Sequence, residues 1–333
     1  MNNEKTTAMI LKFCDLLPDW CNSFVLATGT EYKPLTRLAY IREINNFIDY
    51  LITFVPHFSV LEKKDISPSD FEQITSEDIS RYFTFYFDKG RDKKTVARKR
   101  AVLSSFFQYQ IANKRLTFNP VIAAAKVKLE KTDEIFHLEV DEQLTLLNEV
   151  DCGGHLSKRA EASHHIYRKR DLAILTLMLD TGLRISELQG IDIKDLDFND
   201  CCVFVTRKGN KTQHVYFSDH ASEILKDYLA ERKEYKDKDP LFITHSGERI
   251  GIRAIQKMVK KYAVASLPGK GQKVTPHKMR SSFAFTFYDA SNNDILALQR
   301  KMGHSSINAT NRYVAATDKT MQETRNLVEQ AKK

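Results

Sequence analysis

The sequence predicts a mainly α-helical protein of two domains, with a small β-sheet or hairpin in the second domain. The chain has 333 residues, 42% of them hydrophobic, which is enough apolar material for about two separate cores. In the first third of the chain, apolar residues recur every three or four positions, as on one face of a helix. Residues 195–218 differ, because a strand pattern lies on either side of a Gly209-Asn210 turn.

The first domain is predicted to be all α-helical. Residues 34–54 carry apolar side chains on one helical face, namely Leu38, Ile41, Ile44, Ile48 and Leu51. Thr75 and Asp78 resemble a capping box, so a second helix is expected to start there. Thr95 opens a further amphipathic helix, which ends before Asn119-Pro120.

A short charged stretch separates the two predicted domains. Residues 126–133 (KVKLEKTD) are poor in large apolar side chains, as expected of a linker. The predicted domains are therefore residues 1–133, a helical domain, and residues 134–333, a mixed domain.

The second domain is expected to be helical around its hairpin. Residues 170–183 predict a buried helix that ends at Gly182, and residues 185–190 predict a short helical turn. Helical patterns return after the hairpin, which gives a mainly α domain with a small α+β part.

Composition excludes several classes of protein. The five cysteines are odd in number and form no CxxC pair, which argues against a zinc site or a disulfide framework: Cys14, Cys21, Cys152, Cys201 and Cys202. No segment approaches the ~18 apolar residues of a membrane span, and acidic residues and Pro18 rule out a signal peptide. We expect a cytoplasmic protein with no membrane partner. The net charge of +8 favours a polyanionic partner, but only weakly.

Several short motifs with polar and charged side chains occur in one order along the second domain. They are Arg184 with Glu187 three residues later, Lys208 in the hairpin, His277 and Arg280 in PHKMR, His304, and Tyr313. Each motif alone has a simpler explanation: a surface helix pair, a basic turn, or a tyrosine in amphipathic packing. Together, their order and spacing resemble the tyrosine recombinase (phage integrase) family, whose pattern is Arg, Lys, His-x-x-Arg, His or Trp, then Tyr. The resemblance spans residues 170–313.

The resemblance implies a role for each of these residues. Arg184 and Arg280 would clamp the non-bridging oxygens of the phosphate. Glu187, one helical turn from Arg184, could hold its guanidinium in place. Tyr313 would be the nucleophile, and the product would be a 3′-phosphotyrosine.

The remaining roles concern protons and the phosphate. His277 resembles the family's proton acceptor, Lys208 its general acid, and His304 the group that hydrogen-bonds the scissile phosphate. Since arginine and lysine supply the positive charge, no metal or cofactor is expected.

The sequence departs from the family pattern in places. Ser281 stands where many members carry a second histidine, and Met302 stands where leucine is usual. Arg207 and Lys211 flank Lys208, so the choice of hairpin lysine is open to error. We choose Lys208 because it aligns with the first lysine of the family's GKGxK pattern, and we assign Arg207 and Lys211 to DNA binding.

A basic segment of the first domain is the candidate DNA-binding surface. Residues 89–100 hold seven basic residues and one acidic residue. A solvated helix start is the alternative explanation. The resemblance instead favours contacts to the DNA backbone from Lys93, Lys94, Arg98 and Arg100, with Arg37 in a second candidate helix.

The resemblance also implies partners and an overall arrangement. The fold would be a two-domain, C-shaped clamp around double-stranded DNA that carries a specific recombination site. Relatives form a homotetramer on paired sites, in which the helix after Tyr313 is exchanged between subunits. An accessory translocase or excision factor is a further expected partner.

Several functions remain open within this resemblance. Residues 158–170 and the TRKG hairpin resemble the single-recombinase Xer sub-family, which favours chromosome dimer resolution. The helical pattern of the first domain starts by about residue 36, which leaves little room for the extra ~60-residue domain of many phage integrases. The alternatives are an integrase of a phage or of a conjugative or integrative mobile element, a non-catalytic DNA-binding relative, and a type IB topoisomerase.

Overall fold

The protein divides into two compact units. The computed structural model describes residues 3–125, 135–207, 211–232, 234–303, 310, 311 and 313. Contacts separate unit 1, Met1–Lys131, from unit 2, Thr132–Lys333. The boundary predicted from the sequence lies two residues later, between residues 133 and 134.

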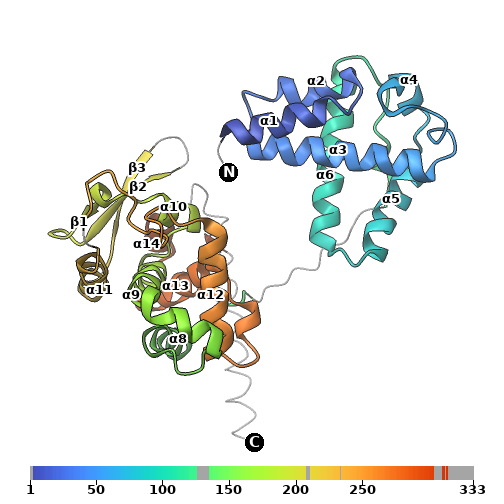
Figure 1. The fold of residues 1–333 in the computed structure, drawn as a ribbon. Helices are drawn as coiled ribbons and strands as arrows, with labels where there is room; N and C mark the ends of the chain where they lie inside the picture. Colours follow the sequence, from blue (N-terminus) through green and yellow to red (C-terminus); the bar gives the residue numbers. More distant parts are fainter. Residues whose placement is uncertain are drawn as a thin grey trace, which may run out of the picture. The chain divides into compact units, whose positions relative to one another are not determined.

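Unit 1 is all helical in its described part (Figure 1). Its elements are α1 (Asn3–Cys14), α2 (Asp19–Ala27), α3 (Pro34–Phe54), η1 (Lys63–Asp65), α4 (Pro68–Phe71), α5 (Ser76–Asp88), α6 (Lys93–Ala112) and α7 (Pro120–Ala123). The helix α3 has the predicted bounds and buries the predicted apolar face. The capping box at Thr75 is confirmed, since its hydroxyl accepts from the Asp78 N–H at 3.2 Å and α5 follows directly.

Two differences in unit 1 have clear local causes. Helix α6 begins at Lys93 rather than at Thr95, because the Asp92 carboxylate accepts from the Thr95 N–H at 2.6 Å and caps the helix earlier. Helices α1 and α2 precede the point at which the helical pattern was expected to start. Figure 1 shows α1 lying along α3, so both belong to the same helical unit.

A buried polar cluster ties three helices of unit 1 together. Glu43 of α3 accepts hydrogen bonds from the Tyr82 hydroxyl of α5 at 2.7 Å and from the Lys99 ammonium of α6 at 2.6 Å. Lys99 belongs to the basic segment assigned above to a DNA-binding surface, yet it is buried. It therefore serves the core of unit 1.

Unit 2 combines helices with a small sheet. The helices are α8 (Val140–Cys152), α9 (Lys158–Thr181), α10 (Ile185–Gly190), α11 (Asp219–Ala230), α12 (Ile252–Ser266), α13 (Pro276–Ala290) and α14 (Ile295–Met302), with η2 (Ile193–Asp195) and η3 (Gly271–Lys273). The strands are β1 (Leu196–Asp197), β2 (Cys202–Arg207) and β3 (Lys211–Tyr216). No helix of the described residues combines the length and apolar character needed to cross a bilayer.

The strands form an antiparallel sheet in the order β1-β2-β3 (Figure 1). The register of β2 and β3 runs from Cys202 opposite Tyr216 to Arg207 opposite Lys211. The predicted hairpin is confirmed, with β1 as an additional strand, while its turn residues lie outside the described part. Val203, Val205 and Val215 turn into the main core of unit 2.

Helix α9 is longer than predicted. It begins at Lys158, so residues 158–169, which precede the predicted start at Arg170, also belong to the helix. His164 within it is buried, and its Nε2 donates to the Val150 carbonyl of α8 at 2.8 Å. The helix ends where predicted, since Gly182 adopts the left-handed conformation with φ of 61°.

We predict that Gly182→Ala lowers the free energy of unfolding by at least about 1–3 kcal/mol. An alanine would be held at positive φ, and its methyl group would lie 2.2 Å from Cδ1 of Phe283. Chemical denaturation measures the loss. Gly154→Ala is the matched control, because nothing lies within 4 Å of a Cβ there. Equal stabilities of the two variants would contradict this account of the α9 terminus.

Candidate active site

The start of α10 holds the first two predicted site residues together. Arg184 is the N-cap residue of α10, and its backbone N–H donates to Glu187 Oε2 at 2.8 Å. The Arg184 guanidinium donates to the other oxygen of the same carboxylate at 2.7 Å. The side chain of Arg184 is 43% exposed, whereas that of Glu187 is 8% exposed. Glu187 thus fixes an arginine that still faces solvent.

Three guanidiniums lie close to the Glu187 carboxylate. In addition to Arg184, Arg207 of β2 lies 3.7 Å from Oε1, and Arg280 of α13 lies 4.0 Å from Oε2. These arginines come from three separate segments of unit 2. Three positive charges therefore face one buried negative charge, so the cluster attracts an anion.

Arg280 is held rigidly by the backbone. Its side chain is 5% exposed, and its guanidinium donates to the carbonyls of Gly182 and, at 2.7 Å, of Met302. Burial, together with the nearby Arg184 charge, lowers the pKa of Arg280 to about 10, against the opposing effect of Glu187. Arg280 therefore remains charged at neutral pH, in an orientation fixed by the ends of α9 and α14.

Tyr313 lies in the same part of unit 2. It is 2% exposed and packs with Phe283, Tyr288 and Met302, while its ring meets Phe285 edge-on at 5.5 Å. Its phenol interacts electrostatically with Arg280, favouring the charged guanidinium. The predicted nucleophile and the predicted phosphate clamp are thus neighbours in the DNA-free chain.

The other predicted catalytic residues are only partly described. His277 is exposed in the first turn of α13, whose start is capped when the Thr275 hydroxyl accepts from the Lys278 N–H at 3.3 Å. Lys208 and His304 lie outside the described residues. Lys211 is described only as backbone, at the start of β3.

Two residues that the sequence analysis did not single out anchor the sheet beside this site. Lys301 of α14 donates to the Tyr216 carbonyl at 2.9 Å, and Gln213 of β3 donates to the Arg300 carbonyl at 3.1 Å. They join β3 to the helix that leads into Gly303. The sequence carried no signal for them, because the pairing depends on how α14 packs against the sheet.

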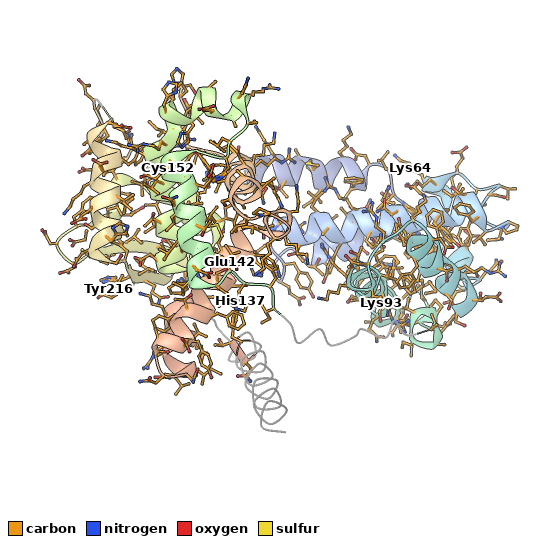
Figure 2. All side chains as sticks on the ribbon, turned by 90° about the horizontal axis from the view of Figure 1, so that it is seen from below. Lys64, Lys93, His137, Glu142, Cys152 and Tyr216 are labelled. Carbon is orange, nitrogen blue, oxygen red and sulfur yellow. The ribbon has the colours of Figure 1, made fainter. Side chains whose placement is uncertain are left out.

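The predicted DNA-binding residues of unit 1 fall into two groups. Lys93, labelled in Figure 2, is exposed at the start of α6, as are Lys94 and Arg98. Arg100 instead donates to carbonyls at the end of α7, among them Ala124 and Ala125 at 2.9 Å each. Arg37 donates through Nε to the Val25 carbonyl at 2.9 Å. Arg100 and Arg37 thus have structural roles, whatever else they contact.

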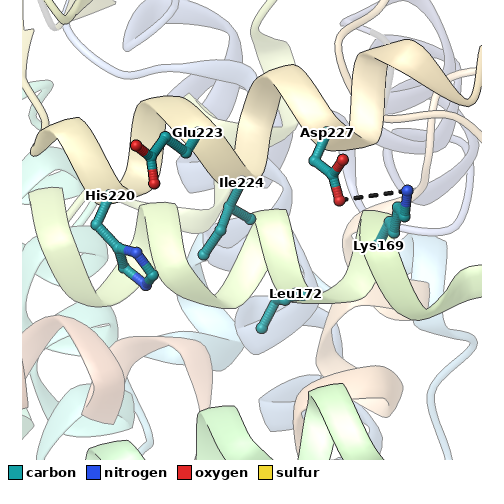
Figure 3. Close-up of a pocket in the computed structure, with 6 residues that line it drawn as sticks. All are labelled: Lys169, Leu172, His220, Glu223, Ile224 and Asp227. Carbon is teal, nitrogen blue, oxygen red and sulfur yellow. Dashed lines mark ion pairs between the residues drawn. The ribbon is translucent and has the colours of Figure 1, made fainter.

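A hollow between α9 and α11 is lined by residues other than those of the candidate active site. The hollow, drawn in Figure 3, has a volume of about 170 Å³. Two of the residues that line it, Lys169 and Asp227, form an ion pair at 3.2 Å. None of the described residues that line it is a predicted site residue. Within the described ranges, no three side chains of His, Cys, Asp or Glu come together to suggest a metal centre.

Comparisons with known proteins point in one direction. Residues 156–320 match the model of the phage integrase family. The chain is 32% identical to tyrosine recombinase XerC of Thermodesulfovibrio yellowstonii, over 77% of this chain and 80% of that one. It is 31% identical to tyrosine recombinase XerS of Streptococcus pyogenes, over 86% and 88%.

A solved structure shows the same fold. The Tn1549 transposon integrase, bound to transposon right-end DNA, superposes with a TM-score of 0.65 at 19% identity, over 93% of this chain and 99% of that one.

We predict that Glu187→Gln lowers the free energy of unfolding by roughly 3 kcal/mol, because three guanidiniums then lose their shared counter-ion. Glutamine keeps the size of the side chain and can still accept the Arg184 N–H. The control is Glu77→Gln, which breaks an exposed pair with Arg81 and should change stability by less than about 1 kcal/mol. Denaturant titration of both variants distinguishes the two cases. A Glu187→Gln loss no larger than that of the control would contradict the counter-ion role.

Proposed function

The chain belongs to the phage integrase family of tyrosine recombinases, and from this premise we propose how its residues break and rejoin DNA. It is a site-specific recombinase, as the sequence predicted, with Xer recombinases among its relatives. The observation that carries the proposal is the gathering of Arg184, Glu187, Arg280 and Tyr313 from separate segments of unit 2.

Arg184 and Arg280 are placed to bind the phosphate group during its transfer. Arg184 is held on one side by Glu187 but remains partly exposed, so its free edge can meet a phosphate. Arg280 is fixed by two carbonyls and stays charged. Donors that are already in position stabilise the negative charge that develops on the non-bridging oxygens, without reorganisation during the reaction.

Tyr313 supplies the nucleophilic oxygen in this proposal. The phenolic oxygen attacks phosphorus, the bond from phosphorus to the 5′-oxygen breaks, and a 3′-phosphotyrosyl ester forms. Because Tyr313 is buried in the DNA-free chain, DNA binding has to expose it. The ester conserves the bond energy, so a 5′-hydroxyl of the partner strand can reverse the step without ATP.

Two further residues transfer the protons, and a third binds the phosphate. His277, exposed at the start of α13, takes the phenolic proton, and Lys208 gives a proton to the leaving 5′-oxygen. His304 hydrogen-bonds the phosphate. No metal or cofactor is part of this scheme, since arginine and lysine carry the positive charge.

DNA is the partner, and both units contribute to its binding in this proposal. Lys93, Lys94 and Arg98 of α6 contact the backbone, with Arg37, Arg100 and Lys211 as further candidates. Four copies assemble on two paired sites and exchange the segment after Tyr313, which lies outside the described residues. An accessory translocase or excision factor would control the order of strand exchange.

We propose chromosome dimer resolution in the cytoplasm as the biological role. It is supported by Xer relatives matched over 80% and 88% of their length. Movement of a mobile element is the second candidate, favoured by the fold shared with a transposon integrase. Recovery of the bound sequence from chromosomal DNA separates the two, because a resolvase uses one chromosomal site and an integrase uses the ends of an element.

We predict that Tyr313→Phe binds its DNA site but forms no covalent adduct, because only the phenolic oxygen is removed. The assay uses a nicked suicide substrate in excess EDTA, with the adduct trapped in SDS. The wild type should give an adduct under the same conditions. Adduct formation by Tyr313→Phe would refute the nucleophile, and its loss from the wild type in EDTA would refute metal-free chemistry.

We predict that Lys208→Ala slows cleavage of normal DNA by about 10²–10⁴-fold, as for a lost general acid. A substrate with sulfur in the bridging 5′ position should recover most of the rate, because a thiolate leaves without protonation. Arg280→Ala should gain nothing from sulfur, since the non-bridging oxygens still need their clamp. Lys211→Ala is the matched control, and sulfur rescue of that variant alone would move the general acid to Lys211.

A further inference from the structure

Arg207 is buried, although it belongs to a basic hairpin. Its side chain is 8% exposed, and all three guanidinium nitrogens are inaccessible to solvent. Among the described residues none accepts a hydrogen bond from these nitrogens. Burial lowers the pKa of Arg207, against the opposing effect of Glu187. Burial of a cation without hydrogen bonds costs free energy, unless a bound anion supplies the missing acceptors.

Strand geometry explains why Arg207 points inward. Side chains alternate along β2, so Val203, Val205 and Arg207 share the buried face while Thr206 is exposed. The family's GKGxK pattern has glycine at the place of Arg207. The TRKG hairpin carries arginine there instead, and the register of the sheet places this arginine at the edge of the catalytic cluster.

Gly303 leaves the space that Arg207 fills. A Cβ at residue 303 would lie 1.1 Å from Nη1 of Arg207. The preceding residue, Met302, accepts a hydrogen bond from Arg280 through its carbonyl. Both arginines thus approach the turn after α14. Arg280 reaches it at Met302, and Arg207 reaches it at Gly303.

Glu187 accepts no hydrogen bond from the Arg207 guanidinium. The 3.7 Å from Arg207 Nε to Oε1 is too long for a hydrogen bond, and the same oxygen accepts from Arg184 at 2.7 Å. One carboxylate is thus left to balance three guanidiniums. A tetrahedral oxyanion offers the acceptors that this cluster lacks, and its negative charge offsets the repulsion between the arginines.

We propose that Arg207 is a third phosphate-binding arginine of the active site, which with Arg184 and Arg280 takes one tetrahedral oxyanion. The proposal rests on the proposed function, in which that oxyanion is the scissile phosphate of DNA. In the absence of DNA the same three arginines bind inorganic sulfate or phosphate. Because the nitrogens are covered in the free chain, the guanidinium leaves the turn at Gly303 as it meets the anion.

The first test needs no DNA. The full-length chain is titrated with sodium sulfate against sodium chloride at constant ionic strength, and its melting temperature is recorded. Sulfate should raise the melting temperature of the wild type and of Arg253→Gln, an exposed control with the same charge change. Arg207→Gln should lose at least half of that rise. It should fold normally without sulfate, because it removes a buried cation that lacks hydrogen bonds.

The second test measures cleavage of the suicide substrate. Arg207→Gln should be about 10²-fold slower than the wild type, as for the loss of one oxyanion donor. A substrate whose scissile phosphate carries a neutral methylphosphonate should reduce this defect to less than about 10-fold, since less charge needs to be balanced. Arg253→Gln should match the wild type on both substrates.

Each outcome bears on a separate claim. If Arg207→Gln keeps the full sulfate response and cleaves at the wild-type rate, Arg207 is not a phosphate ligand, while the proposed function stands. If it cleaves slowly but gains nothing from methylphosphonate, it acts through packing and the proposal is overturned. If the wild type cleaves no DNA, the proposed function fails, and the sulfate response still decides whether Arg207 belongs to an anion site.

Discussion

One buried carboxylate organises the catalytic unit. Glu187 fixes Arg184 directly and lies within 4.0 Å of Arg207 and Arg280, so three guanidiniums share one counter-ion. Much of unit 2 serves to bring these arginines together. Gly182 ends α9 and offers its carbonyl to Arg280, the β2 register turns Arg207 inward, and α14 ends beside both.

This arrangement is unfavourable without a ligand and favourable with one. Like charges in a buried cluster repel one another, and the pKa of Arg280 is lowered by its burial and by the Arg184 charge. An anionic phosphate removes that repulsion at the moment it binds. Arg184 and Arg280 are already held in position by Glu187 and by backbone carbonyls, so only Arg207 has to move when the anion binds.

The sequence predicted the parts of the fold and site that depend on local patterns. The α3 face, the Thr75 cap, the Gly182 terminus and the hairpin followed from spacing and turn residues, and the family followed from the order of its motifs. What escaped prediction was non-local. Lys99 resembled its basic neighbours but pairs with Glu43, 56 residues away. Arg207 resembled a DNA-facing residue beside Lys208 until the strand register and the gap at Gly303 placed it within the cluster.

A double-mutant cycle between Glu187 and Arg207 tests the shared counter-ion most directly. Free energies of unfolding are measured in sulfate-free buffer for the wild type, Glu187→Gln, Arg207→Gln and the double variant. If the carboxylate balances the buried guanidinium, loss of Arg207 reduces the penalty of Glu187→Gln by at least about 1 kcal/mol. Additive effects, within about 0.5 kcal/mol, would show that the two residues do not interact and would contradict the account.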